Sequence, residues 1–145
     1  MSLSHFVQAQ EPVYDQALGE LRSGHKYSHW MWFIFPQLGA LGRSARAHFF
    51  GLADMAQAAA YLQHPVLGPR LLDATRAMLL HPDRSAVDIL GQVDALKFRS
   101  CMTLFALAAP QEPVFIRALQ VFYEGKADPA TLALCGCAGL AHDAL

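Results

Sequence analysis

Proline and glycine residues interrupt this sequence at short intervals, and their spacing limits the chain to short elements of secondary structure. Between them, apolar residues recur three and four positions apart, as on one buried helix face. Helices are expected after Ser4, from Pro12 to Gly24, from Asp54 to Leu62, from Leu67 to Leu80, from Asp94 to Ala109, from Val114 to Glu124 and from Pro129 onward. With no hairpin signal and no repeat, the pattern predicts an all-α fold, a compact single-domain bundle of about seven short helices.

The secondary structure of one stretch cannot be predicted from its apolar pattern. Trp30 to Phe35 is apolar at every position, so periodicity cannot distinguish a buried helix from a buried strand. Pro36 ends the segment in either case. A glycine-containing loop is expected from Leu38 to Ser44.

Length and composition fit one domain with a large core. The chain has 145 residues, of which 54% are hydrophobic and 16% charged, so it is apolar enough to fold without disulfides or metals. We predict a single helical domain over residues 1–134, followed by a weakly patterned, loose C-terminal tail over 135–145.

Charge and cysteine content exclude several classes of protein. The net charge is −1 and the basic residues are scattered, so no stripe would neutralise a run of phosphates and no nucleic-acid partner is expected. No apolar run approaches the roughly 20 residues of a membrane span, and the N-terminus lacks a secretory pattern. We therefore expect no membrane partner. Three cysteines, an odd number, in a chain without a secretory pattern predict a reduced, cytoplasmic protein.

Three residues of the helix that begins at Asp94 are candidates for chemistry. Asp94 and Lys97 share a face, and Ser100 follows within a turn of Lys97. A partly buried Lys97 would act as a base or hold an anion, and Asp94 would keep it charged. The alternative is an ordinary helix-surface ion pair worth a few tenths of a kcal/mol.

Histidine and cysteine pairs suggest metal sites only weakly. His25 and His29 are spaced to share a helix face, but the zinc-protease pattern needs a glutamate where Lys26 stands. The set of Cys135, Cys137 and His142 lacks a second cysteine pair for structural zinc. We therefore expect no metal and no cofactor, and His29 is either a proton-moving group or a packed side chain with one hydrogen bond.

The aromatic run and Arg70 complete the set of candidates. Trp30 and Trp32 would stack a flat ligand beside Gln37, or they belong to the core. Arg70 lies near a helix N-terminus, where the dipole favours anions. This placement is explained if Arg70 faces either an anionic ligand or an acidic side chain.

Four stretches carry a resemblance to a known family: Phe6 to Gln10, Lys26 to Gln37, the two segments Tyr61-Leu62 and Leu67 to Leu71, and Asp94 to Phe105. They resemble the bacterial family called domain of unknown function 1810, some members of which are labelled calpastatin-like. The resemblance runs from about Phe6 to Leu134 and implies an all-α fold with no established activity. Calpastatins are long polar inhibitors, whereas this chain is compact and apolar.

The segment His5 to Gln10 is also similar to a short stretch of the YbiA-like proteins, the family named for NAD and ADP-ribose metabolism (NADAR). That resemblance implies action on N-glycosidic bonds of ribose derivatives. The chain lacks a counterpart of that family's glycine- and tryptophan-rich C-terminal stretch.

Two functional hypotheses follow. The first is a pocket that binds or hydrolyses a small anionic ligand of nucleotide or ribosyl type. Its catalytic residues would be His29, Asp94 and Lys97, and its ligand-binding residues Trp30, Trp32, Gln37, Arg70 and Ser100. The second is a non-catalytic interaction domain or homodimer that uses the excess apolar surface.

Overall fold

The computed structural model describes residues 2–136, and this part of the chain is all-α, as expected. It holds ten α-helices and one 3₁₀ turn, and its only β-type pairing is a parallel bridge between Leu38 and Leu52. The elements are α1 (Ser4–Gln10), α2 (Tyr14–Ser23), α3 (Met31–Ile34), η1 (Gly39–Leu41), α4 (Ala45–Phe49), α5 (Met55–Gln63), α6 (Leu67–Met78), α7 (Ala86–Leu90), α8 (Gln92–Ala108), α9 (Pro113–Tyr123) and α10 (Pro129–Leu134).

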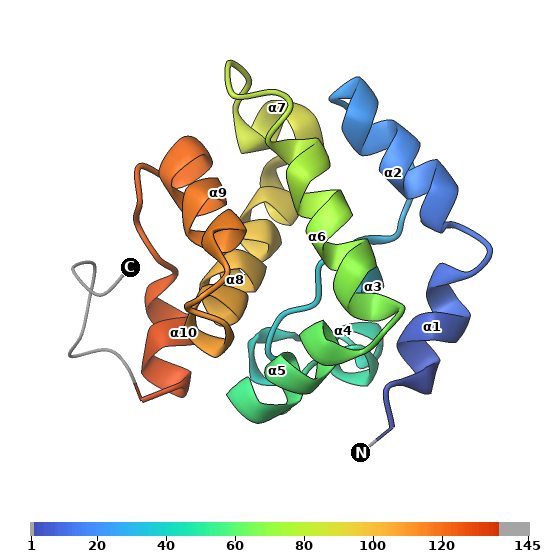
Figure 1. The fold of residues 1–145 in the computed structure, drawn as a ribbon, viewed down its shortest axis with the longest axis vertical. Coiled ribbons are helices and arrows are strands. Elements are labelled where there is room, and N and C mark those ends of the chain that lie inside the picture. Colours follow the sequence, from blue (N-terminus) through green and yellow to red (C-terminus); the bar gives the residue numbers. More distant parts are fainter. Residues whose placement is uncertain (1, 137–145) are drawn as a thin grey trace.

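Helix α8 runs through the middle of the bundle, with α9 and α10 on one side of it and α6, followed by α2 and α1, on the other (Figure 1). It packs against α5, α7, α9 and α10, while α6 packs against α2, α5 and α9. Nine of its residues are buried, which explains why it is apolar on most of its circumference. Because α8 contacts the core on so many sides, its exposed side chains, which include Val93 and Leu96, all lie in its first turns.

The local start and stop signals account for several helix ends. The side chain of Asp54 accepts a hydrogen bond from the backbone N–H of Gln57 and so caps α5, and Asp128 caps α10 through Thr131 in the same way. Gly24 ends α2 in the left-handed conformation, with φ of 83°, which favours glycine.

The structure corrects two expected starts and the number of helices. Pro12 lies in a turn, and α2 begins at Tyr14; Ser4 is the first residue of α1, with Leu3 at the cap position. The helices beyond the expected seven include α3 and α4, of four and five residues. Elements of one turn are too short to show a period of 3.6, so packing against the rest of the fold must hold them.

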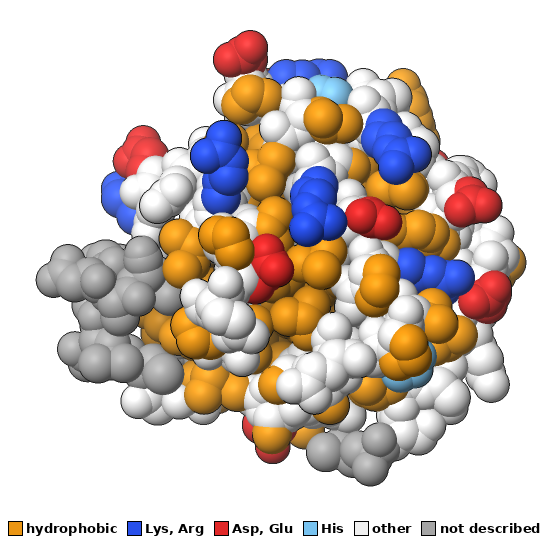
Figure 2. Space-filling view, in the orientation of Figure 1, with side chains coloured by type: hydrophobic (Ala, Val, Ile, Leu, Met, Phe, Trp, Pro, Cys, Tyr) orange, Lys and Arg blue, Asp and Glu red, His pale blue; other side chains and the backbone are white. Residues whose placement is uncertain are grey.

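Charged side chains of both signs are interspersed with apolar ones on the face shown in Figure 2, and no large area of one sign appears there. Within residues 2–136, no helix is both long and apolar enough to cross a bilayer. The expectation of a loose tail concerns mainly residues 137–145, which lie outside the described part of the chain.

Candidate functional site

The loop over residues 25–30, between α2 and α3, is held by one buried carboxylate. Glu20 is 8% exposed, and its Oε1 accepts hydrogen bonds from the backbone N–H of Tyr27 (2.8 Å) and Ser28 (3.0 Å) and from the indole N–H of Trp30 (3.0 Å). Its Oε2 accepts from the hydroxyl of Ser28 and from Nε2 of Gln16 (3.1 Å). Burial alone would raise the pKa of Glu20, but the hydrogen bonds from Ser28, Tyr27 and Trp30 lower it to about 2.

This anchored loop brings a lysine against the start of α8. The Lys26 ammonium lies 2.9 Å from Oδ2 of Asp94, and the Lys97 ammonium lies 3.8 Å from Oδ1 of the same carboxylate. The Lys26 side chain is only 8% exposed, whereas Lys97 is 24% exposed. Two ammonium groups and one carboxylate leave a net charge of +1, with Lys97 as the more accessible cation.

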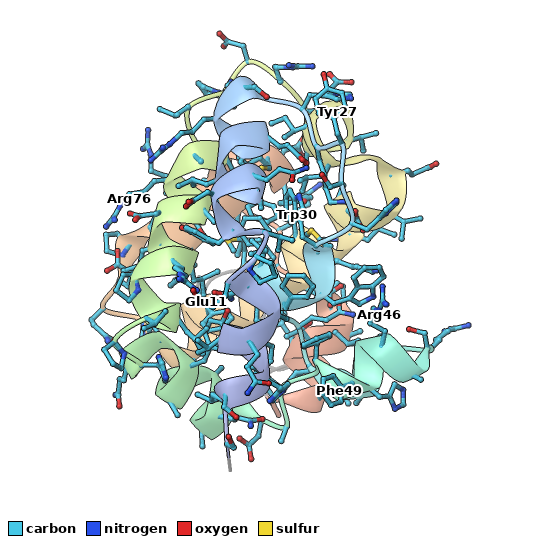
Figure 3. The ribbon with its side chains drawn as sticks, turned by 90° about the vertical axis from the view of Figure 1, so that its right-hand side faces the viewer. Glu11, Tyr27, Trp30, Arg46, Phe49 and Arg76 are labelled. Atoms are coloured by element: carbon cyan, nitrogen blue, oxygen red, sulfur yellow. The ribbon has the colours of Figure 1, made fainter. Side chains whose placement is uncertain are left out.

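Trp32 lies beside this ion cluster. The Lys97 ammonium is 5.0 Å from the centroid of the Trp32 ring, and the Arg46 guanidinium is 4.9 Å from it. Both distances are within the range of cation–π attraction. The half-buried indole therefore fixes two cations at the surface, where Figure 3 shows Arg46.

A groove of about 580 Å³ opens next to Lys97, between the segment 37–47, the first half of α8 and the start of α10. We call it the Lys97 groove. Its lining residues are Gln37, Leu41, Gly42, Arg43, Ser44, Ala47, Val93, Leu96, Lys97, Ser100, Asp128 and Ala130.

The Lys97 groove combines an apolar wall with a few polar groups. Val93 and Leu96 are 66% and 65% exposed, and they line the groove together with Leu41. Its cations are Arg43, which is exposed, and Lys97. A mostly apolar hollow with a small number of polar groups is the usual form of a small-molecule site.

The structure brings together five of the residues that the sequence singled out. Gln37, Lys97 and Ser100 line the Lys97 groove directly. Asp94 and Trp32 lie behind Lys97 and hold its ammonium. Ser100 is buried, and its hydroxyl donates to the backbone carbonyl of Leu96 at 3.2 Å.

Trp30 and His29 lie outside this groove. Trp30 is fully buried and its indole N–H is bonded to Glu20, so it belongs to the core, where Figure 3 shows it. His29 is exposed in the loop over residues 25–30, which is not helical, so the spacing from His25 does not place both rings on one helix face. Its ring makes no hydrogen bond with any described residue.

Arg70 belongs to a second polar cluster, between α1 and α6. Its guanidinium donates to Oε1 of Glu11 at 3.1 Å and to Oε1 of Gln10 at 3.3 Å, and it lies over the ring of Tyr14. In Figure 3, Glu11 and Arg46 lie on opposite sides of α1. Of the two roles expected for Arg70, the structure shows the contact with an acidic side chain.

Four contributors to the site were not singled out from the sequence: Glu20, Lys26, Arg43 and Asp128. Lys26 and Asp128 bond to residues distant in the chain, Asp94 and Ser100, and no local spacing indicates such pairs. Glu20 bonds to a loop that is not helical, and the Arg43 side chain bonds to no described residue, so helical spacing indicates neither of them. Asp128 carried a signal of its own, the cap followed by proline, but that signal describes a helix start and says nothing of a groove.

The thiols and metal candidates add nothing to this site. Cys101 is fully buried, and burial raises its pKa well above the ordinary value, so it is a core residue. Within residues 2–136, no three His, Cys, Asp or Glu side chains gather as metal ligands would. Cys137 and His142 lie outside the described residues.

Fold and site together define a small all-α protein with a cationic, partly apolar groove. Residues 1–135 match the model of the family described as "Protein of unknown function (DUF1810)", and the chain belongs to that family, as the resemblance indicated. It is similar to the crystal structure of the conserved hypothetical protein Rv1873 from Mycobacterium tuberculosis. The two are 46% identical with a TM-score of 0.91, over 92% of this chain and 96% of the other. No curated protein matches the chain.

Proposed function

We propose that the protein binds a small anionic molecule of the nucleotide or sugar-phosphate class in the Lys97 groove. The observation that carries this proposal is the placement of the Lys97 ammonium. It lies on the groove wall, 3.8 Å from Asp94 and 5.0 Å from the Trp32 ring, and it is still 24% exposed. A cation held in place before binding loses little side-chain entropy when an anion arrives.

The charges of the ion cluster attract an anion rather than repel it. Asp94 is the acid paired with Lys97, and Lys26 already neutralises it at 2.9 Å. Arg43 adds a second cation to the groove without an ion pair to any described residue. The apolar side chains of Val93 and Leu96 would cover the ring of a ligand whose phosphate contacts these cations.

Catalysis is the further step that the sequence suggested, and it would use Asp94 or His29. In a ribosyl or nucleotide hydrolysis, one of them would move a proton or position a water molecule. Both Asp94 oxygens lie next to ammonium groups, at 2.9 and 3.8 Å, and this arrangement supports anion binding more directly than proton transfer.

The test is a thermal-shift and calorimetry panel of inorganic phosphate, AMP, ADP-ribose and ribose 5-phosphate. A ligand of the native state raises the melting temperature. The variant Arg43→Gln is expected to keep the ligand-free melting temperature, since its side chain bonds to no described residue, and to lose about tenfold in affinity. Arg76→Gln, which removes an exposed cation of α6, should bind like the wild type. Absence of binding by every member at millimolar concentration would refute the proposal.

A second function, a protein-interaction domain, rests on a separate observation. Val87, Val93 and Leu96 are at least half exposed around the start of α8, and Leu96 also lines a second hollow, of about 370 Å³, toward Tyr123. Self-association would appear in light scattering as a mass that rises with concentration. It should be reduced by Leu96→Ser if this surface is responsible.

A further inference from the structure

The two oxygens of the Asp128 carboxylate have different environments. Oδ2 accepts hydrogen bonds from the Thr131 backbone N–H (3.0 Å), from the Thr131 hydroxyl (2.6 Å) and from the Ser100 hydroxyl (3.2 Å), whose single proton is shared with the Leu96 carbonyl. Oδ1 accepts none from any described residue. One oxygen therefore caps α10, and the other keeps its hydrogen-bonding capacity.

The free oxygen is accessible. Among the described residues, no buried side-chain oxygen or nitrogen lacks a partner, so an unbonded Oδ1 on the half-buried Asp128 must reach solvent. Asp128 is a lining residue of the Lys97 groove, and an accessible carboxylate oxygen is an acceptor for a hydroxyl group.

The position of this acceptor is fixed before any ligand binds. The Asp128 backbone N–H donates to the Thr103 hydroxyl at 2.9 Å, and Thr103 is buried in α8. Together with the three bonds to Oδ2, this contact holds both the backbone and the carboxylate plane of Asp128. An acceptor so held discriminates between ligands, because a mismatched group leaves it unpaired.

We propose that Asp128 makes the Lys97 groove selective for a phosphorylated polyol, such as a sugar phosphate or a nucleotide. The phosphate lies at Lys97 and Arg43, and a ligand hydroxyl donates to Oδ1 of Asp128. This inference rests on the proposed function, since it assigns the second recognition element of the same groove. A ligand with an anionic group at both ends is disfavoured, because its second anion would face the carboxylate.

The variant Asp128→Asn replaces a hydrogen-bond acceptor by a donor at one position of the groove. Ser100 and Thr131 donate to Oδ2, so the amide oxygen must occupy that position, and the NH₂ group then takes the place of Oδ1. Asparagine caps helices as well as aspartate does, so the fold should be retained. The groove thereby exchanges an acceptor for a donor at nearly constant shape.

The experiment compares ribose 5-phosphate with methyl phosphate, which has the phosphate but no hydroxyl group, by calorimetry. We expect the wild type to prefer ribose 5-phosphate by about tenfold, as for a hydrogen bond to a charged group. Asp128→Asn should lose that preference and still bind methyl phosphate. Asp54→Asn, the same change at the cap of α5 and outside the Lys97 groove, should behave like the wild type.

The outcomes separate this inference from the proposed function. A wild type that binds both phosphates equally, or a preference that survives in Asp128→Asn, would overturn the role of Asp128 and leave anion binding in place. A wild type that binds neither phosphate would overturn this inference, which predicts binding of ribose 5-phosphate, and the proposed function would fall with it if inorganic phosphate, AMP and ADP-ribose also fail to bind. An Asp128→Asn protein with a native melting temperature and no affinity for methyl phosphate would also contradict the inference, because it predicts retained phosphate binding.

Discussion

The Lys26 ammonium lies 2.9 Å from Oδ2 of Asp94, and this pair joins the loop before α3 to the start of α8. Lys26 is fixed further by its backbone N–H, which donates to the carbonyl of Ile89 at 2.8 Å, and by its position 5.0 Å from the centroid of the Trp30 ring. The pair thus connects the buried centre of the molecule to Lys97 on the groove wall.

Removal of one member of this pair should be costly. In Lys26→Met, Asp94 would keep only the Lys97 ammonium at 3.8 Å, and the largely buried carboxylate would lose its shortest ion pair. We expect a loss of about 3 kcal/mol in the free energy of unfolding, because breaking a buried pair leaves a charge uncompensated. Urea denaturation monitored by circular dichroism measures this free energy.

The exposed pair of Arg76 and Asp73 provides the matched control. Its members are more than half exposed, and its nitrogen–oxygen distance is 3.5 Å. Arg76→Met should change the free energy of unfolding by less than about 1 kcal/mol, as for other surface pairs. Equal losses in the two variants would show that burial of Lys26 does not strengthen its pairing.

Glu20 should make the stability depend on pH in the acid range. Its pKa is lowered to about 2 in the folded protein from an ordinary value of 4.5. A depressed folded-state pKa means that the ionised carboxylate stabilises the fold above pH 4.5, and that this stabilisation is lost as the pH falls from 4.5 toward 2. Glu20→Gln should lose about 2 kcal/mol at pH 7, because its amide NH₂ would face the donors that now bond to the carboxylate.

Denaturant unfolding at several pH values between 7 and 3 provides the measurement. The wild type should weaken below about pH 4.5 more steeply than Glu20→Gln does. Glu112→Gln, which replaces a carboxylate without a hydrogen bond to any described residue, is the control for the loss of one carboxylate. A Glu20→Gln profile parallel to both would mean that Glu20 does not titrate abnormally.

The sequence was sufficient to predict features that depend on residues close together in the chain. The caps at Asp54 and Asp128, the stop at Gly24 and the pair of Asp94 with Lys97 all join residues within one turn, and all are present. The apolar run around Trp30 was ambiguous because every side of it is apolar, and it contains only the single turn α3.

Contacts between distant segments could not be predicted in this way. Nothing near Lys26 in the sequence indicates that its partner is on α8. Arg70 was a sound candidate for an anion site on its own helix, but the structure pairs it with Glu11 of the turn after α1. The groove itself needs three segments to meet, and only the folded chain brings them together.

Gly68 should tolerate no side chain. A Cβ at this position in α6 would lie 2.0 Å from the carbonyl oxygen of Leu62, which belongs to the backbone of α5 and cannot rotate away. Gly68→Ala is therefore expected to lose about 3 kcal/mol in the free energy of unfolding through overpacking. Gly19→Ala is the control, because a Cβ there meets nothing within 4 Å and alanine favours the helix by up to about 1 kcal/mol. Equal stability of the two variants would contradict the close approach of α6 to α5 at this position.

The two tryptophans should report separately on the core and on the site. Trp30 is fully buried, whereas Trp32 is half-buried beside Lys97. Trp32→Phe leaves Trp30 as the only tryptophan of the chain, and its fluorescence should be blue-shifted and resistant to acrylamide, since water and quencher do not reach it.

The same variant connects the ion cluster to ligand binding. A phosphate that engages Lys97 would move the ammonium relative to the indole 5.0 Å away, so titration with ribose 5-phosphate should change the emission of the wild type. The change should be absent in Trp32→Phe, while calorimetry still detects binding. A ligand-dependent change that persists in Trp32→Phe would have to come from Trp30. It would place the effect of the ligand near Glu20, which accepts the hydrogen bond of the Trp30 indole, rather than at the Lys97 groove.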